Sequence, residues 1–269
     1  QIRSNPEKDL EPEPPVDRVP SRAKRTWPMS RGWAIVWASF FTTAFASGGS
    51  QYGFGLFVEP LEQEFGWTRT QINLSLSIGL VSGLLSPLVG WGVDKYGSRM
   101  IMTASLVIVA VSFLLRAGMT ELWQWYVLSV LLAVGFPGTF LPIGKLVGTW
   151  FPATRGRMMG TAITGNNVFG LVGVPLMSLV IQTEGWRLAY AIIGTGVTIV
   201  AVAVWFIVRS APQSKAELVS ESRPVSGNPA HPGDYSLREA LITRKFWMLL
   251  AGVTCAGFSY PSFMTQLIP

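Results

Sequence analysis

The residues of this chain best suited to chemistry are polar side chains inside long apolar runs. Lys145 is the only charge well within the fourth predicted helix, and its ammonium group either neutralises an anionic ligand, serves ion coupling, or extends to the polar end of the segment. Asn166 and Asn167 offer paired donors and acceptors that either bind a carboxylate or bridge two helices. Gln51 and Tyr52 form a further pair, in which Tyr52 either donates to a carboxylate or belongs to an interfacial aromatic belt.

Other kinds of site have little support in the sequence. The chain has one histidine, His231, and one cysteine, Cys255, which excludes a site with two imidazoles, an internal disulfide and a thiolate metal cluster. The phosphate-binding pattern Gly-xxxx-Gly-Lys-Ser/Thr does not occur, and no acid pair lies inside an apolar run. We therefore expect no enzyme, no catalytic residue, no metal and no cofactor.

Long uncharged runs must position the polar candidates. Only 13% of the 269 residues are charged, about half the usual share of roughly 25%. A bilayer-spanning helix needs ~20 mostly apolar residues, and the run between Arg99 and Arg116 reaches this length if both arginines extend to its ends. The runs predict seven transmembrane helices: Gly32–Val58, Thr70–Val93, Met100–Leu115, Leu122–Gly144, Met158–Thr183, Leu188–Val208 and Phe246–Pro269.

The distribution of basic residues predicts the orientation of these helices. Of the 21 lysines and arginines, 17 lie in alternate connecting segments, which the positive-inside rule assigns to the cytoplasm. The net charge of +6 is thus explained by topology, and we expect no nucleic-acid partner. The sequence predicts a multi-pass protein of a cell membrane (inner or plasma), with the lipid bilayer as a partner and a cytoplasmic N-terminus.

Composition divides the chain into four predicted parts. Residues 1–30 form a polar, proline-rich tail that is expected to be disordered, and residues 31–208 form a six-helix transmembrane bundle. Residues 209–243 are too long for a tight helix–helix turn and predict a cytoplasmic linker. Residues 244–269 begin a further bundle with the seventh helix, so we expect a fragment of a longer protein.

A short motif follows the second predicted helix. It reads Gly90-Trp-Gly-Val-Asp94-Lys95-Tyr-Gly97-Ser-Arg99. Its glycines allow a tight reversal between two packed helices, and Asp94 at a helix end can accept hydrogen bonds from the loop. The charged residues Asp94, Lys95 and Arg99 either have a function at this turn or only fix the topology.

This motif resembles the signature loop of the major facilitator superfamily. The resemblance implies an all-α integral membrane protein, in which this chain is the first six-helix half of a twelve-helix transporter plus one helix. The missing C-terminal half is then a partner of the same protein. In the family the equivalent acid latches the two halves together, which implies a gating role for Asp94, with Lys95 and Arg99 as its charge partners.

Other stretches are similar to one branch of that superfamily, the monocarboxylate transporters and oxalate:formate antiporters. One stretch runs from Tyr52 to Leu61 and continues into Glu64-Phe-Gly-Trp-Thr-Arg69. Another is Trp150-Phe-Pro-Ala-Thr-Arg155-Gly-Arg157, which matches the branch's paired basic residues at the cytoplasmic start of the fifth helix.

The resemblance also implies a function. Helices 1, 2, 4 and 5 of this fold face a central cavity, and they carry the polar candidates named above. We expect secondary active transport of a small organic anion, of monocarboxylate or dicarboxylate type, by alternating access. Either a proton or an exchanged anion drives it, as symport or antiport. The alternatives are transport of another small solute on the same fold, and a receptor or accessory protein that transports nothing.

Residues at the opposite membrane face have simpler expected roles. The segment Glu64–Arg69 and the similar phrase Glu184-Gly-Trp-Arg187 are predicted to be interface anchors. Arg116, at the end of the third helix, is predicted to be an anchor as well.

Overall fold

The computed structural model describes residues 29–208, 243–244, 246–248 and 251–252. The predicted tail (1–30), linker (209–243) and seventh helix (244–269) therefore lie almost wholly outside the described residues. Within the described part the chain is helical, and no strand occurs there. The all-α prediction is confirmed.

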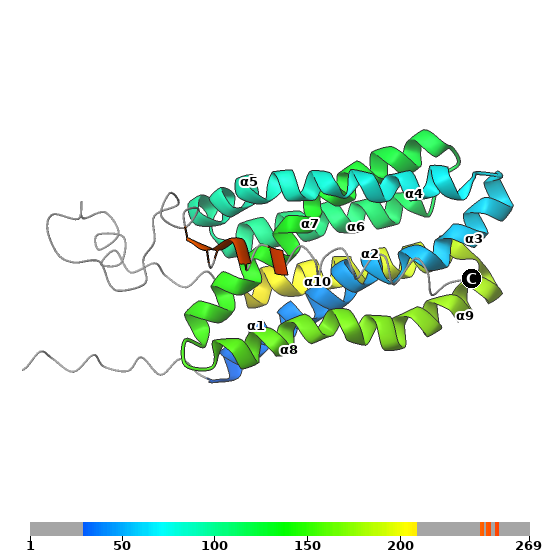
Figure 1. Cartoon of the computed structure of the whole chain (residues 1–269). Helices are drawn as coiled ribbons and strands as arrows, with labels where there is room; N and C mark the ends of the chain where they lie inside the picture. Colours follow the sequence, from blue (N-terminus) through cyan, green and yellow to red (C-terminus); the bar gives the residue numbers. More distant parts are fainter. Residues whose placement is uncertain (1–28, 209–242, 245, 249–250, 253–269) are drawn as a thin grey trace, which may run out of the picture.

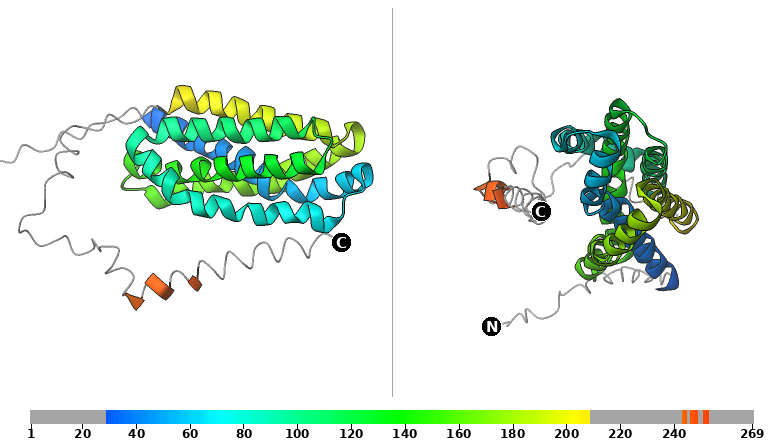
Figure 2. Two further views of the ribbon diagram at one scale, coloured as in Figure 1. Left: turned by 90° about the horizontal axis from the view of Figure 1, so that it is seen from above. Right: turned by 90° about the vertical axis from the view of Figure 1, so that its right-hand side faces the viewer.

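The helices of residues 29–208 form six segments. These segments run side by side along one long axis (Figures 1 and 2). The sharp turns between them include three glycines with positive φ, Gly66, Gly97 and Gly185, a conformation that favours glycine. In chain order the segments are α1 (Met29–Thr42), η1 (Thr43–Gly48), α2 (Gly49–Gln51) and α3 (Phe54–Phe65); α4 (Arg69–Ile78) and α5 (Leu80–Tyr96); α6 (Ser98–Arg116); α7 (Leu122–Trp150); α8 (Arg155–Val168), η2 (Phe169–Gly173) and α9 (Val174–Glu184); and α10 (Trp186–Ile207).

Five of these segments are long and apolar enough to cross a membrane. They are Arg69–Tyr96, Ser98–Arg116, Leu122–Trp150, Arg155–Glu184 and Trp186–Ile207. The bundle thus has two ends, which we name by a residue of each. The Asp94 end holds the turn between α5 and α6, and the Glu64 end holds the turn between α3 and α4.

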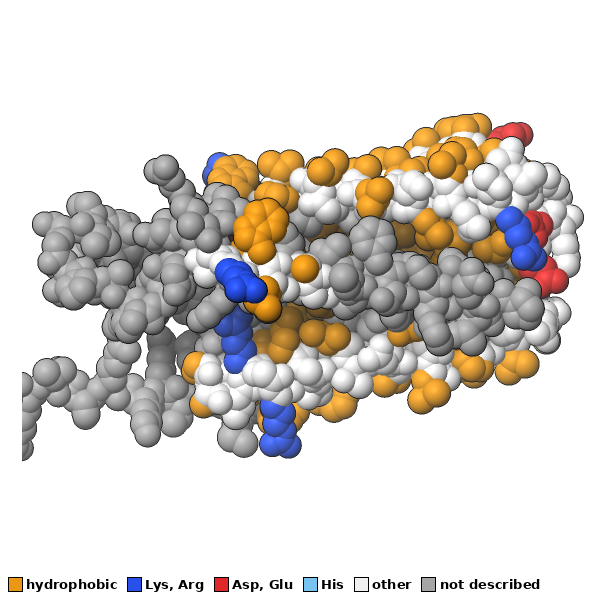
Figure 3. Space-filling view, in the orientation of Figure 1, with side chains coloured by type: hydrophobic (Ala, Val, Ile, Leu, Met, Phe, Trp, Pro, Cys, Tyr) orange, Lys and Arg blue, Asp and Glu red, His pale blue; other side chains and the backbone are white. Residues whose placement is uncertain are grey.

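Large aliphatic side chains cover the outside of the bundle, as a hydrocarbon solvent requires. Leu80, Leu84 and Leu88 follow one another at helical spacing along α5 and are 76%, 80% and 64% exposed. Figure 3 shows such apolar side chains along the length of the visible face. Inside, Phe57 of α3 stacks on Tyr190 of α10 with ring centroids 3.7 Å apart. This exterior is typical of a protein that lies in a bilayer.

The first and fifth segments are each interrupted by a π-helix. The sequence predicts that the first helix is split by Ser47-Gly-Gly-Ser50 and then by Gly53 and Gly55. Ser47 to Ser50 stay helical, within η1 and α2, whereas the chain does leave the helix at Tyr52 and Gly53. A π-helix carries an extra residue per turn and occurs often at functional sites.

Candidate functional site

The two π-helices lie where the first and fifth segments approach most closely. The Thr43 hydroxyl donates to the Ala162 carbonyl oxygen at 2.5 Å. A Cβ atom at Gly165 would overlap the backbone carbonyl oxygen of Phe40, and one at Gly48 would lie 2.5 Å from the Cβ of Phe169. Glycine is therefore required at both positions to bring these backbones together.

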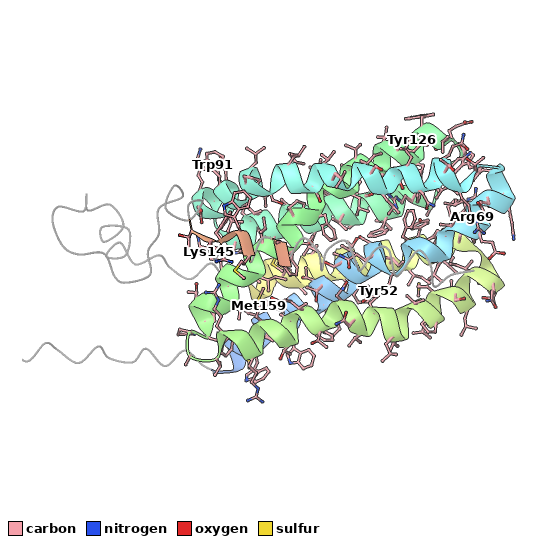
Figure 4. The ribbon with its side chains drawn as sticks, in the orientation of Figure 1. Tyr52, Arg69, Trp91, Tyr126, Lys145 and Met159 are labelled. Carbon is pink, nitrogen blue, oxygen red and sulfur yellow. The ribbon has the colours of Figure 1, made fainter. Side chains whose placement is uncertain are left out.

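Close approach of the segments brings four of the predicted site residues together. The Tyr52 hydroxyl donates to Asn167 Oδ1 at 3.0 Å, and Asn166 Nδ2 donates to Gln51 Oε1 at 3.5 Å. A Cβ at Gly170 would lie 3.2 Å from the Tyr52 ring, so the missing side chain leaves the ring room against the fifth segment. We call Gln51, Tyr52, Asn166 and Asn167 the polar cluster. Figure 4 shows Tyr52 within the bundle, between its two ends.

Within the polar cluster, Asn166 lies well inside the fifth segment and carries an acceptor that is unpaired among the described residues. Asn166 lies about 17 Å from the start of that segment at Arg155 and about 27 Å from its end at Glu184, at ~1.5 Å per residue. The Asn166 Oδ1 atom is buried and has no hydrogen-bond partner among the described residues. An uncompensated buried acceptor costs free energy, which a bound donor group or water would recover.

Lys145 does not join the polar cluster. Its Nζ lies 2.8 Å from Oδ1 of Asp94, which joins α7 to the last turn of α5 at the Asp94 end. The Lys145 and Asp94 side chains are 43% and 74% exposed. The sequence predicts for Lys145 either a ligand, an ion-coupling role or extension to the interface, and it names no partner. The structure brings this candidate and the signature-loop acid into one ion pair.

The expected partnership of Asp94 with Lys95 and Arg99 is absent from the described contacts. Lys95 Nζ lies 4.6 Å from the centroid of the Trp91 ring, and the guanidinium carbon of Arg99 lies 4.1 Å from the centroid of Trp205. Adjacent residues of a helix point in different directions, so Lys95 diverges from Asp94. Arg99 belongs to α6 and faces α10, because the chain has turned in between.

Of the motif's glycines, Gly97 makes the turn. Its φ of 87° lies in the region that favours glycine, and it separates α5 from α6. Gly90 lies inside α5, where an added Cβ would meet no described atom within 4 Å. The expected role of Gly90 in the reversal is therefore wrong, since the reversal occurs seven residues later.

Arg155 and Arg157 lie in the first turn of α8 and are exposed. The Arg155 side chain lies beside Gly148, where an added Cβ would be 3.4 Å from its Nε atom. Cations are unfavourable near a helix N-terminus, so the intrinsic preference of the helix does not explain the pair. Their assignment to the cytoplasmic side stays a prediction.

The two similar outer phrases contact each other at the Glu64 end. Glu64 accepts hydrogen bonds from Trp186 Nε1 and from Arg187 Nη1, each at 2.5 Å. These two donors lower the pKa of the Glu64 carboxyl below its usual value. The Phe65 ring stacks on Trp67 with centroids 4.5 Å apart. The sequence predicts interface anchors here but does not predict that the two phrases contact each other. The available signal is that one phrase carries an acceptor, Glu64, and the other carries two donors, Trp186 and Arg187.

Arg116 points into the bundle, so its predicted role as an interfacial anchor is wrong. The residue is only 4% exposed. Its guanidinium carbon lies 4.4 Å from the centroid of Trp125, and Nη2 donates to the Ser129 hydroxyl at 2.9 Å. The aromatic ring and the hydroxyl replace part of the hydration that burial removes, which makes an inward position tolerable.

In the described part of the chain, no group of three His, Cys, Asp or Glu residues could hold a metal ion.

The fold and the polar cluster define a multi-pass, all-α membrane protein in which two interrupted helices bring polar side chains together. The family model of the Major Facilitator Superfamily matches residues 40–269, and the chain belongs to this family. The resemblance drawn from the signature loop is thereby confirmed.

Three relatives indicate the part of the family to which the chain is similar. The oxalate:formate antiporter of Oxalobacter formigenes is 22% identical over 224 residues, which cover 82% of this chain and 51% of that protein. Monocarboxylate transporter 3 of Mus musculus is 28% identical over 170 residues, or 61% of this chain and 33% of its own length. The uncharacterized MFS-type transporter YcxA of Bacillus subtilis (strain 168) is 25% identical over 254 residues, or 91% and 59%. The chain thus spans between a third and three fifths of these relatives.

Proposed function

We propose that the intact protein is a secondary active transporter that moves a small organic anion by alternating access. The substrate is of monocarboxylate or dicarboxylate type, and transport is coupled to a proton or to an exchanged anion. The observation that carries this proposal is the polar cluster, which joins two interrupted helices away from both ends of the bundle. The family and the names of the relatives support it.

The chemistry of the cluster suits a carboxylate. A phenol and carboxamide N–H groups donate to carboxylate oxygens, and in a low-dielectric environment such hydrogen bonds are stronger than in water. The four residues carry no charge, so the counter-charge of an anion must come from another part of the protein. We assign it to the C-terminal half of the transporter, or to Lys145 when its pair with Asp94 opens.

The ion pair at the Asp94 end has the properties of a gate. It joins α5 to α7. Both side chains are exposed to solvent, so the pair can exchange partners at little cost in free energy. We assign Asp94 the latch between the two halves, with Lys145 as its partner while the latch is open. This end faces the cytoplasm, as does the N-terminus, with Arg155 and Arg157 on the same side of a cell membrane.

A neutral solute is the second candidate substrate. The observation that favours it is the composition of the cluster, since two amides and a phenol bind neutral hydroxyl or amide groups as well as carboxylates. A receptor or accessory protein on the same fold would bind a ligand at the cluster but show no flux.

The test is uptake by the intact protein in proteoliposomes. Labelled formate, oxalate, lactate and a neutral polyol are supplied with either an imposed proton gradient or an internal anion. We expect uptake of at least one anion, and we expect Tyr52→Phe to raise its KM about tenfold or more, the effect of losing a hydrogen bond to a charged group.

A second tyrosine supplies the matched control. Tyr126 also uses its hydroxyl, donating to the Gln71 carbonyl oxygen at 3.0 Å, but it lies at the Glu64 end (Figure 4). Tyr126→Phe should leave KM within about twofold of the original. Uptake of the polyol alone would favour the second candidate, binding without flux would favour a receptor, and an unchanged KM in Tyr52→Phe would remove the cluster from the site.

A further inference from the structure

A groove lies between α6 and α10 on the outside of the bundle. Its volume is about 370 Å³. Most of its wall is aliphatic or aromatic, and its lining includes Thr103, Val107, Leu114, Val202, Trp205 and Phe206. The proposed transport function does not use this groove.

The groove faces the medium that surrounds the bundle. Val107, Val202 and Phe206 are 49%, 53% and 72% exposed, and both helices belong to segments able to cross a membrane. From Thr103 to Leu114 the groove follows α6 for about 17 Å, roughly half of a ~30 Å hydrocarbon core. Its length thus corresponds to one leaflet, and the occupant available there is a lipid acyl chain.

The end of the groove that lies toward the start of α6 carries a cation. Arg99 precedes Thr103 by four residues, so both lie on one face of α6, and the Arg99 guanidinium lies over Trp205, a wall of the groove. The ion pairs found among the described residues involve Arg69, Lys145 and Arg187, so within this part of the chain Arg99 has no acidic partner. Its Nε atom is buried and lacks a hydrogen-bond acceptor there, and Thr103 Oγ1 is buried without a partner as well.

The start of α6 adds a second attraction for negative charge. The helix begins at Ser98, and its N-cap, Gly97, has no side chain to accept hydrogen bonds from the first amides. The free N–H groups and the positive end of the helix dipole favour an anion at this position. The guanidinium and the helix N-terminus therefore act on the same small region.

We propose that this groove binds one molecule of an anionic phospholipid. One acyl chain occupies the apolar wall between α6 and α10, and the headgroup phosphate accepts hydrogen bonds from Arg99 and from the start of α6. A zwitterionic lipid is disfavoured because, among the described residues, no acidic side chain forms an ion pair with Arg99 and could instead pair with the ammonium group of the lipid. The inference does not depend on the transported substrate.

The experiment measures lipid binding to the intact, purified protein. Dioleoylphosphatidylglycerol and dioleoylphosphatidylcholine are titrated separately into the detergent-solubilised protein, and bound lipid is counted by native mass spectrometry. We expect the protein to prefer the anionic lipid by about fivefold, the gain from one favourable basic contact. Arg99→Gln should abolish this preference, whereas Arg99→Lys should keep most of it.

Two further variants separate the parts of the site. Val107→Trp adds bulk at an exposed position of the wall, and it should lower binding of both lipids without changing their ratio. Arg157→Gln is the matched control, because it removes an exposed arginine at the same end of the bundle but outside the groove. It should leave the preference unchanged.

Several results would overturn the proposal. One is equal binding of the two lipids by the unaltered protein, and another is an equal loss of preference in Arg99→Gln and Arg157→Gln, which indicates a diffuse basic surface. Unchanged lipid binding in Val107→Trp, or a dimer that this variant abolishes, would show that the groove holds no acyl chain. Binding measured for Val107→Trp and Arg99→Lys keeps the test valid if Arg99→Gln does not fold.

Discussion

The ion pair between Asp94 and Lys145 gives a prediction whose size follows from its geometry. At 2.8 Å, Coulomb's law gives about 1.5 kcal/mol in bulk water and about 6 kcal/mol at an effective dielectric constant of ~20. The side chains are 74% and 43% exposed, so solvent screening applies and the lower figure is the better guide. Exposed pairs measured by double-mutant cycles contribute ~0.2–1 kcal/mol. We expect a coupling free energy of about 0.5–1 kcal/mol for this pair.

The assay is a double-mutant cycle on Asp94→Asn and Lys145→Met in the intact protein. Reversible unfolding in mixed micelles gives the coupling free energy, which should fall when salt shortens the Debye length to ~3 Å at 1 M. Uptake into proteoliposomes gives the turnover. If the pair is part of the gate, each single variant should slow turnover while insertion is retained, and the double variant should be no slower than the worse single variant.

The control is Lys95→Met, because Lys95 is adjacent in sequence but lies over Trp91. It should change turnover less than either partner of the pair. A coupling free energy indistinguishable from zero would refute the pair. A slowed Asp94→Asn beside an unaffected Lys145→Met would show that Asp94 acts through another partner. A raised KM in Lys145→Met alone would make Lys145 a substrate ligand.

Three further predictions concern stability. Because the pKa of Glu64 is lowered in the folded protein, its contacts with Trp186 and Arg187 stabilise the fold above pH ~4.5, and this stability is lost as pH falls through the lowered pKa. The thermal midpoint measured between pH 3 and 6 should therefore depend less on pH for Glu64→Gln than for the unaltered protein. Gly165→Ala should cost about 1–3 kcal/mol in chemical unfolding, whereas Gly160→Ala, which meets no described atom within 4 Å, should be neutral or mildly stabilising. Arg116→Lys should lower the thermal midpoint, since an ammonium group cannot stack on Trp125 and reach Ser129 together; an unchanged midpoint would contradict the role of the ring.

Much of the fold follows from simple quantities in the sequence. The uncharged runs predict seven helices because a bilayer admits few charges, and five of them correspond to segments of suitable length and composition. The first run is instead divided at Tyr52 and Gly53, and the seventh lies almost wholly outside the described residues. Glycine at positions 97 and 185 marks turns that require positive φ. The π-helices escape prediction, because their extra residue per turn depends on tertiary packing between segments about 120 residues apart, as the 2.5 Å bond from Thr43 to Ala162 illustrates.

The candidate site shows the same division. Polar residues in apolar runs identify Tyr52, Asn166 and Asn167 as candidates, because burial without a purpose is costly. Which of them meet depends on helix rotation, which the sequence does not specify. Lys145 is the clearest example: its ~7.5 Å distance from the helix end at Trp150 predicts that its side chain can leave the apolar zone, but its partner on another helix follows only from the packing.

The π-helix Thr43–Gly48 also sets the angular phase of everything that follows it in the first segment. An α-helix advances about 100° per residue, and the π turn accommodates one extra residue without this rotation. If the same residues formed a regular α-helix, every later side chain of the segment would be rotated by about that amount. Gln51 and Tyr52 would then turn away from the fifth segment, and the polar cluster would cease to exist without the loss of any of its members.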